Sequence, residues 1–167
     1  SLPDGPDFVA ALFGALKIGA VVVMVNPHLN REQYDYFLGY TRARAVVCDP
    51  ECSTPLIEAT TNAVHLTSCV TDRAKITGVA NILEPAMTHR DDPAFWLFSG
   101  GTTGKPKAVV QTHRSFVNTT HYYAKGALKY SADDITLSVP KLFFGYATGS
   151  NLLFPFSVGA KAVLFSE

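Results

Sequence analysis

The sequence predicts an α/β fold with a parallel-rich sheet flanked by helices. Continuous runs of β-branched residues at 21–25 and 45–48 are typical of strands that are covered on both faces of a parallel sheet. Helical patterns separate such runs, and this alternation favours right-handed crossover connections. The chain has 167 residues, of which 47% are hydrophobic and 17% charged, so it is long enough for a sizeable core.

Local signals predict the elements of the first half in chain order. A helix at 8–17 follows turn residues and a capping aspartate, Asp7, and its apolar character on nearly every side predicts burial. Gly19 ends this helix. A second helix begins at Asn30, whose spacing from Gln33 resembles a capping box. The other elements expected here are strands at 21–25, 45–48 and 64–66 and a helix near 56–58.

The second half is predicted to start with two strands that flank a glycine-rich loop. An acidic turn at 131–134 then breaks the chain, and there we place the boundary between an α/β lobe at 1–128 and the start of a second α/β lobe at 129–167. The elements expected around this turn are strands at 94–97 and 109–112, a helix at 113–128, a strand at 135–139, a helix at 151–156 and a strand at 162–165.

The loop between the two strands reads S-G-G-T-T-G-K-P-K from Ser99 to Lys107. Its glycines allow backbone amides to point at one anion, while hydroxyls and ammonium groups add donors and charge, so the loop predicts phosphate binding. A Walker loop would need a glycine at Ser99 and a hydroxyl at Pro106. We therefore expect the phosphate to be held between strands. For Lys105, a solvated loop lysine is an equally good interpretation.

Composition excludes several function classes. The net charge is zero, which leaves no electrostatic footprint for nucleic acid or an anionic membrane, and no apolar run reaches the length of a membrane span. Cys48, Cys52 and Cys69 lack metal-ligand spacing, so we expect no metal site and interpret them as reduced, structural thiols of a cytoplasmic protein. The chain begins without an initiator Met and ends after a strand-like run, so we expect it to be truncated at both ends.

Two stretches together resemble the adenylate-forming superfamily of acyl-CoA synthetases, luciferases and peptide-synthetase adenylation domains. Residues 98–108 resemble its phosphate-loop signature, and P-K-L-F-F-G-Y at 140–146, with F-P and V-G-A soon after, is similar to its aromatic acyl-pocket segment. The form K-L-F-F-x-Y, the opening L-P-D-G-P-D-F and the run K-I-G-A-V-V-V-M-V-N-P look most like the benzoate-CoA ligase branch. The resemblance implies a fragment of the large N-terminal domain.

The resemblance implies an ATP-dependent, AMP-forming ligation of a carboxylate to coenzyme A, with Mg²⁺-ATP, coenzyme A and benzoate or a related aromatic acid as partners. No catalytic residue falls in this fragment, because the family's lysine comes later, so the fragment alone should be inactive. The sequence departs from the family at Gly100, where a hydroxyl is usual, and at Ala108, where a glycine is usual. The implied phosphate ligands are Ser99, Gly100, Gly101, Thr102, Thr103, Gly104 and Lys107.

The resemblance also implies an acyl pocket at Phe144, Tyr146 and Ser150. Phe144 and Tyr146 lie two residues apart, so on an extended segment they would share a face and flank a flat acyl group. Core packing would explain Tyr146 equally well and Phe144 less well. The neighbouring bulky residues argue for a short, closed pocket.

Two other functions stay open from the sequence. One is a fatty-acyl-CoA synthetase or another adenylating enzyme of the same superfamily. The other is a nucleotide-binding module without ligase activity, which Gly100 modestly favours. The sequence also leaves a homodimer open.

Overall fold

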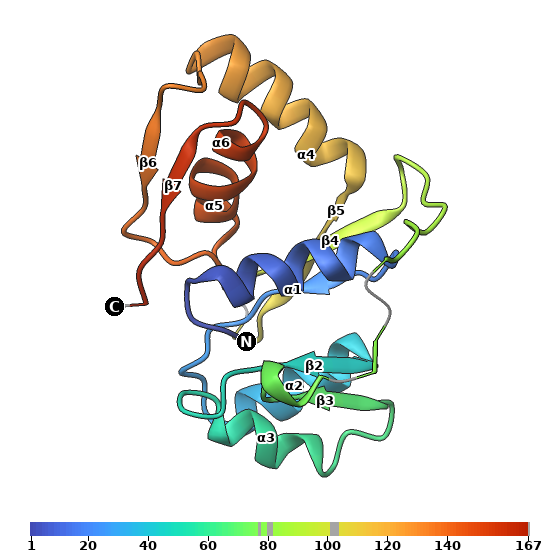
Figure 1. Cartoon of the computed structure of the whole chain (residues 1–167). Coiled ribbons are helices and arrows are strands. Elements are labelled where there is room, and N and C mark those ends of the chain that lie inside the picture. The colour runs from blue at the N-terminus through green and yellow to red at the C-terminus, as the bar shows by residue number, and fades with distance from the viewer. Residues whose placement is uncertain (77, 80–81, 101–103, 167) are drawn as a thin grey trace. The chain divides into compact units, whose positions relative to one another are not determined.

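The structure is a computed structural model that describes residues 1–76, 78–79, 82–100 and 104–166. The described residues gather into two compact units (Figure 1). The small unit comprises Ser1–Pro3 and Val25–Leu83, and the large unit comprises Asp4–Met24 and Glu84–Glu167. No helix within these described ranges has both the length and the apolar character that a membrane span requires.

The small unit is a two-stranded parallel sheet with helices. Ala45 pairs with Ser68 and Val47 with Val70. Asn30 begins the first helix in a complete capping box with Gln33, as the sequence predicted, because each side chain accepts a hydrogen bond from the other residue's backbone N–H. The elements are α2 (Arg31–Thr41), β2 (Ala45–Val47), α3 (Thr54–Thr60), β3 (Ser68–Val70) and the short 3₁₀ turn η1 (Arg73–Lys75).

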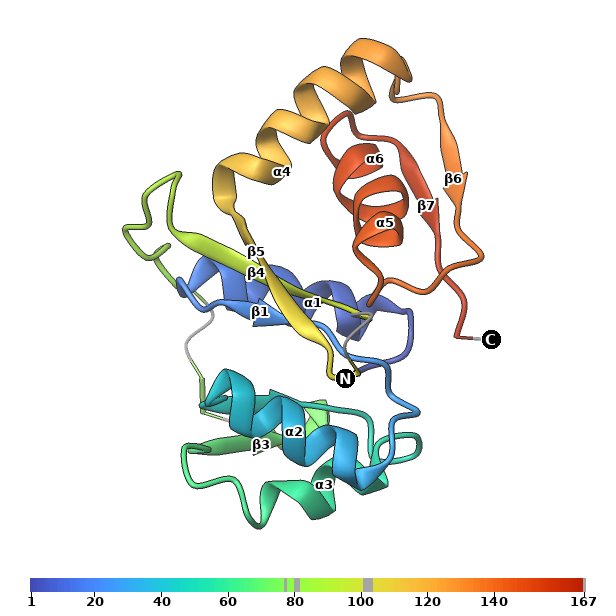
Figure 2. The same ribbon diagram turned by 180° about the vertical axis from the view of Figure 1, so that it is seen from behind.

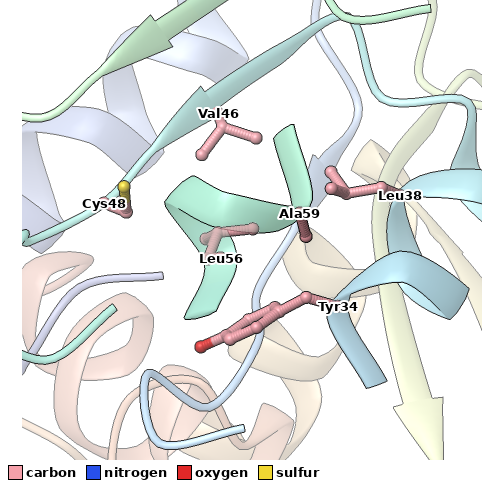
Figure 3. Packing of buried hydrophobic residues seen from close by; sticks show 6 residues of the cluster. All are labelled: Tyr34, Leu38, Val46, Cys48, Leu56 and Ala59. Carbon is pink, nitrogen blue, oxygen red and sulfur yellow. The ribbon is translucent and has the colours of Figure 1, made fainter. Parts of the chain in front are cut away.

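The core of the small unit lies between its sheet and its two helices, as Figure 3 shows. Tyr34 is fully buried, and its hydroxyl donates a hydrogen bond to the carbonyl of Asn26 at 2.8 Å. Burial raises the pKa of the Cys48 thiol to about 12, so this thiol stays neutral at physiological pH. The core residues are Tyr34, Leu38, Val46, Cys48, Leu56 and Ala59.

The large unit contains a three-stranded sheet in the order β1-β4-β5 (Figure 2). β1 runs parallel to β4, and β4 and β5 form an antiparallel hairpin. A long helical run follows β5 directly, and Thr112 caps its start together with Ser115. The elements are α1 (Pro6–Lys17), β1 (Val22–Val23), β4 (Pro93–Ser99), β5 (Lys107–Thr112), α4 (His113–Thr119) and its wider π-helical continuation η2 (Thr120–Ala127).

The rest of the large unit is a second helical run flanked by a parallel strand pair. Buried Asp4 ties the start of the unit to this region, because its carboxylate accepts the backbone N–H of Leu142 at 2.9 Å. Buried Asn151 donates from its side-chain amide to the carbonyl of Val163 at 3.0 Å. The elements are β6 (Ile135–Leu137), α5 (Gly145–Thr148), the π-helical η3 (Gly149–Leu153), α6 (Phe154–Phe156) and β7 (Lys161–Val163).

The α/β class with parallel pairing is confirmed, but the strand neighbours differ from the expected alternation. β1 pairs with β4, whereas β2 and β3 form a separate sheet. The strand expected at 64–66 lies at 68–70, because a turn in which the N–H of Leu66 donates to Ala63 occupies the earlier residues. The boundary expected at 128/129 falls inside the large unit, and as a division of the whole protein it stays a prediction.

Two local expectations about α1 were wrong. Its N-cap is Gly5, and Asp7 lies within the first turn. There a carboxylate still stabilises the helix by interacting with the positive end of the helix dipole. The helix is also less buried than its composition indicates: Phe8 and Leu12 are buried, whereas Phe13 is 38% exposed. Gly19 follows the helix with a φ of 75°, in agreement with its predicted role as a stop.

Candidate functional site

The predicted phosphate loop connects β4 and β5. Because these strands are antiparallel, the last residue of β4 and the first of β5 lie at one end of the sheet, where Ser99 pairs with Lys107. Both of these residues are exposed. Residues 107–112 form a strand, as predicted, whereas a Walker loop leads into a helix.

The backbone of the loop explains part of its glycine content. Gly104 has a φ of 101°, a conformation that side-chain-bearing residues rarely adopt. Among the described residues, a Cβ added at Gly100 would meet no heavy atom within 4 Å, so none of them requires glycine there. The predicted ligands Gly101, Thr102 and Thr103 lie outside the described residues.

A pocket of about 250 Å³ opens in the large unit between the β4–β5 hairpin and the two helical runs. The apolar side chains that line it are those of Leu97, Phe116 and Phe154. At Gly145 and Gly149 the backbone itself forms the pocket wall. A Cβ at Gly145 would lie 2.7 Å from Cδ1 of Leu97, and one at Gly149 would lie 3.1 Å from the Phe154 ring. These two glycines therefore preserve the space that the apolar side chains enclose.

The same pocket also has polar side chains, and most of these were not predicted from the sequence as site residues. Gln111, Ser115, Thr119 and Tyr123 follow one another at intervals of four residues along β5, α4 and η2. On a helix this spacing places side chains on one face, so it could have indicated a polar strip. Tyr146, which was expected at an acyl site, also lines the pocket, and its role there stays a prediction.

The expected geometry of the acyl segment was wrong. Tyr146 lies within helix α5, whereas Phe144 is the extended residue before it, so the two do not share the face of an extended segment. The helix starts here because the carbonyl of Phe144 accepts both the N–H and the hydroxyl of Thr148, each at 3.0 Å. The helical run expected at 151–156 consequently begins at Gly145.

Phe144 and Ser150 are not among the residues that line this pocket. Phe144 is 54% exposed and packs against Phe143, with ring centroids 4.4 Å apart. Ser150 accepts a hydrogen bond at its backbone carbonyl from the Tyr130 hydroxyl at 3.0 Å. Their roles as acyl contacts remain predictions.

The model of the AMP-binding enzyme family matches residues 1–167. A benzoate–CoA ligase from Thauera aromatica is 36% identical over 98% of this chain and 33% of its own length. A 4-hydroxybenzoate–CoA/benzoate–CoA ligase from Rhodopseudomonas palustris is 35% identical over 99% of this chain and 32% of its own length.

Two solved structures agree closely with the fold. The anthranilate CoA ligase AuaEII, in complex with anthranoyl-AMP, matches with a TM-score of 0.91 and 31% identity, covering 100% of this chain and 34% of that one. A benzoate CoA ligase from Burkholderia xenovorans LB400 matches with a TM-score of 0.88 and 34% identity, covering 99% of this chain and 34% of that one. This chain thus spans about a third of the length of these relatives, and over all of its own length it belongs to the AMP-binding enzyme family.

Proposed function

We propose that the full-length protein is an AMP-forming ligase that joins an aromatic carboxylate to coenzyme A. The observation that carries this proposal is the pocket of about 250 Å³ with aromatic walls, which lies in the same compact unit as the loop-bearing hairpin. The similarity to benzoate–CoA and 4-hydroxybenzoate–CoA ligases supports it. This chain contributes the phosphate loop and part of the acid site.

The proposed reaction has two steps. The carboxylate oxygen attacks the α-phosphorus of ATP, the bond to the pyrophosphate leaving group breaks, and acyl-adenylate forms. The thiol sulfur of coenzyme A then attacks the acyl carbon, loses its proton and displaces AMP. The first step brings an anion to a polyanion, so neutralising and orienting the phosphates matters more than a protein base.

Within this chain the loop residues would hold the β- and γ-phosphates. Lys107 offers a charge-assisted contact at the exposed end of the hairpin. Ser99, Gly100 and Gly104, together with residues 101–103, would add hydroxyl and backbone donors. Among the residues that the structure describes, no group of three His, Cys, Asp or Glu side chains could hold a metal ion. We propose that Mg²⁺ arrives with ATP, because this ion is usually bound by substrate phosphates together with waters and one or two carboxylates.

The acid would occupy the aromatic pocket. Phe154 and Tyr146 come from the second helical run, and Phe116 comes from α4, so a planar ring can contact side chains from two directions. Aromatic pairs contribute ~0.5–1.5 kcal/mol beyond the burial of their surface. Phe144 and Ser150 stay in the proposal as contacts at the edge of this site.

A panel of carboxylates offered to the full-length protein with ATP and coenzyme A tests the proposal. We expect kcat/KM to be higher for benzoate than for hexanoate or palmitate, because the pocket is small and flanked by rings. A clear preference for palmitate would assign the protein to fatty acids and leave the phosphate loop intact. If no acid were turned over while ATP still bound, the protein would be a non-catalytic nucleotide-binding module.

A further inference from the structure

Gln111 places an amide side chain in the pocket of the large unit. On β5 it pairs directly with Phe95 of β4, and directly opposite residues of antiparallel strands project from the same face of a sheet. Leu97, two residues beyond Phe95, projects from that face as well and lines the pocket. Phe95 itself is 2% exposed and packs on Phe116, with ring centroids 4.5 Å apart. The Gln111 amide therefore lies beside the aromatic wall.

The serine and threonine hydroxyls of the pocket already have partners. The Ser115 hydroxyl is 3.1 Å from that of Thr112 and accepts the Thr112 N–H at 3.3 Å in the cap of α4. The Thr119 hydroxyl donates to the Ser115 carbonyl at 2.8 Å. Tyr123 and Tyr146 are 48% and 73% exposed, so water still reaches these side chains.

Gln111 differs from Ser115 and Thr119 in having no such partner in the part of the chain that the structure describes, and from the two tyrosines in being less exposed. Within the described residues no hydrogen bond engages its side-chain amide, which carries two N–H donors and an acceptor oxygen. An unsubstituted ring entering the pocket would remove water from this amide and leave it unpaired, which is unfavourable. A ring that bears a hydroxyl or amino group could replace the lost water with a direct hydrogen bond.

We propose that Gln111 is a specificity-determining residue, which hydrogen-bonds to a hydroxyl or amino substituent on the ring of the aromatic acid. The inference rests on the proposed function, because it assumes that the pocket holds the acid. It narrows the expected substrate from benzoate to a hydroxybenzoate or an aminobenzoate.

The test compares the full-length wild-type protein with Gln111→Leu, using benzoate and the three positional isomers of hydroxybenzoate and aminobenzoate. We expect the wild type to have its highest kcat/KM with one substituted acid. The Leu variant should lower kcat/KM for that acid about 3- to 10-fold more than for benzoate, the usual effect of losing one hydrogen bond. Gln111→Met is a second variant that keeps the length of the side chain.

Asn118→Leu is the matched control, because Asn118 is an exposed residue of α4 that does not line the pocket. It should not alter the preference among the acids. Two results would overturn the inference about Gln111: an equal loss for every acid in both Gln111 variants, or a wild type that prefers benzoate to all substituted acids. A wild type that turns over only aliphatic acids would instead reject the aromatic function, and with it this inference.

Discussion

Ser99 and Lys107 face each other across the antiparallel ladder of β4 and β5, at the end where the glycine-rich loop leaves the sheet. The pairing holds both ends of the loop at the same edge, and both residues are exposed. The Lys107 ammonium can thus remain hydrated until an anion binds, so the fold does not bear the cost of burying its charge. This arrangement is compatible with the proposed binding and release of the phosphates of ATP at this loop.

Replacing Lys107 by Ala in the full-length protein should slow adenylate formation. A charge-assisted phosphate contact contributes ~1.5–3 kcal/mol, which corresponds to about a 10- to 100-fold loss in the rate of ATP–pyrophosphate exchange at low ATP. Lys125→Ala is the control, because Lys125 is another exposed lysine on the η2 segment of the same unit. Exchange kinetics that do not change in Lys107→Ala would remove Lys107 from the phosphate site.

Introducing a hydroxyl with Gly100→Ser should tighten ATP binding. A Cβ at this position meets no heavy atom of the described residues within 4 Å. One added hydrogen bond should contribute no more than about 1 kcal/mol. Gly104→Ala should act in the opposite direction, because its φ of 101° would cost a side-chain-bearing residue ~1–3 kcal/mol. Calorimetric titration with ATP measures both. Weaker binding in Gly100→Ser would show that the missing hydroxyl is not a lost phosphate donor.

The sequence predicted best those features that depend on neighbouring residues. The capping box of Asn30 and Gln33 is complete within one helical turn, and the strands around the loop follow from their own composition, aromatic and apolar in β4 and β-branched in β5. The partners of the strands could not be predicted in this way. A run such as 21–25 indicates a covered strand, but its composition does not distinguish β4 from β2 as a neighbour.

The pocket of the large unit shows the same limit of prediction from sequence. Gln111 lines it because β5 pairs with β4 in one particular register and α4 lies over the resulting face, which is tertiary information. The helical conformation of Tyr146 was not predicted, for a related reason. The segment before it is rich in aromatic residues, which have moderate helix propensity. At the helix start the Thr148 hydroxyl contacts the carbonyls of Leu142 at 2.6 Å and Phe144 at 3.0 Å, and composition does not indicate these contacts.

Asp4 should make stability depend on pH. Burial raises the pKa of the Asp4 carboxyl above 3.8, the ordinary value for an aspartate. The folded protein therefore holds this proton more tightly than the unfolded chain does. The contribution of Asp4 to stability is therefore greatest below pH 3.8 and falls as the pH rises through the raised pKa. Asp4→Asn removes the titration and keeps an oxygen that can accept the Leu142 N–H.

We expect the difference in melting temperature, Asp4→Asn minus wild type, to become more positive as the pH is raised from acidic to neutral, because only the wild type loses the contribution of the protonated carboxyl. Asp133→Asn, which changes an exposed carboxylate, controls for the loss of one negative charge. A difference that stays constant with pH would contradict a raised pKa at Asp4.

The cysteines of the small unit should differ sharply in reactivity. Cys48 is 2% exposed, and its raised pKa keeps it protonated, whereas Cys69 is exposed. Because the thiolate is the reactive form, iodoacetamide at pH 8 should modify Cys69 in the native protein and spare Cys48 until the protein is unfolded. Peptide mass spectrometry resolves the two sites. Early labelling of Cys48 would show that the core of the small unit opens readily.

Gly149 should set the depth of the acid pocket. A Cβ there would lie 3.1 Å from the ring of Phe154, and this ring also packs edge-on against Tyr123 and Tyr130, with centroid separations of 6.2 and 6.1 Å. Phe154 is thus confined from several sides, so in Gly149→Ala the added methyl group should take its volume from the pocket. We expect kcat/KM to fall about tenfold more for 4-methylbenzoate than for benzoate. Gly14→Ala, whose Cβ meets nothing within 4 Å, should leave the ratio of the two acids unchanged. Equal losses for both acids in Gly149→Ala would mean that Phe154 moves away from the new methyl group, and that another residue limits the size of the acid.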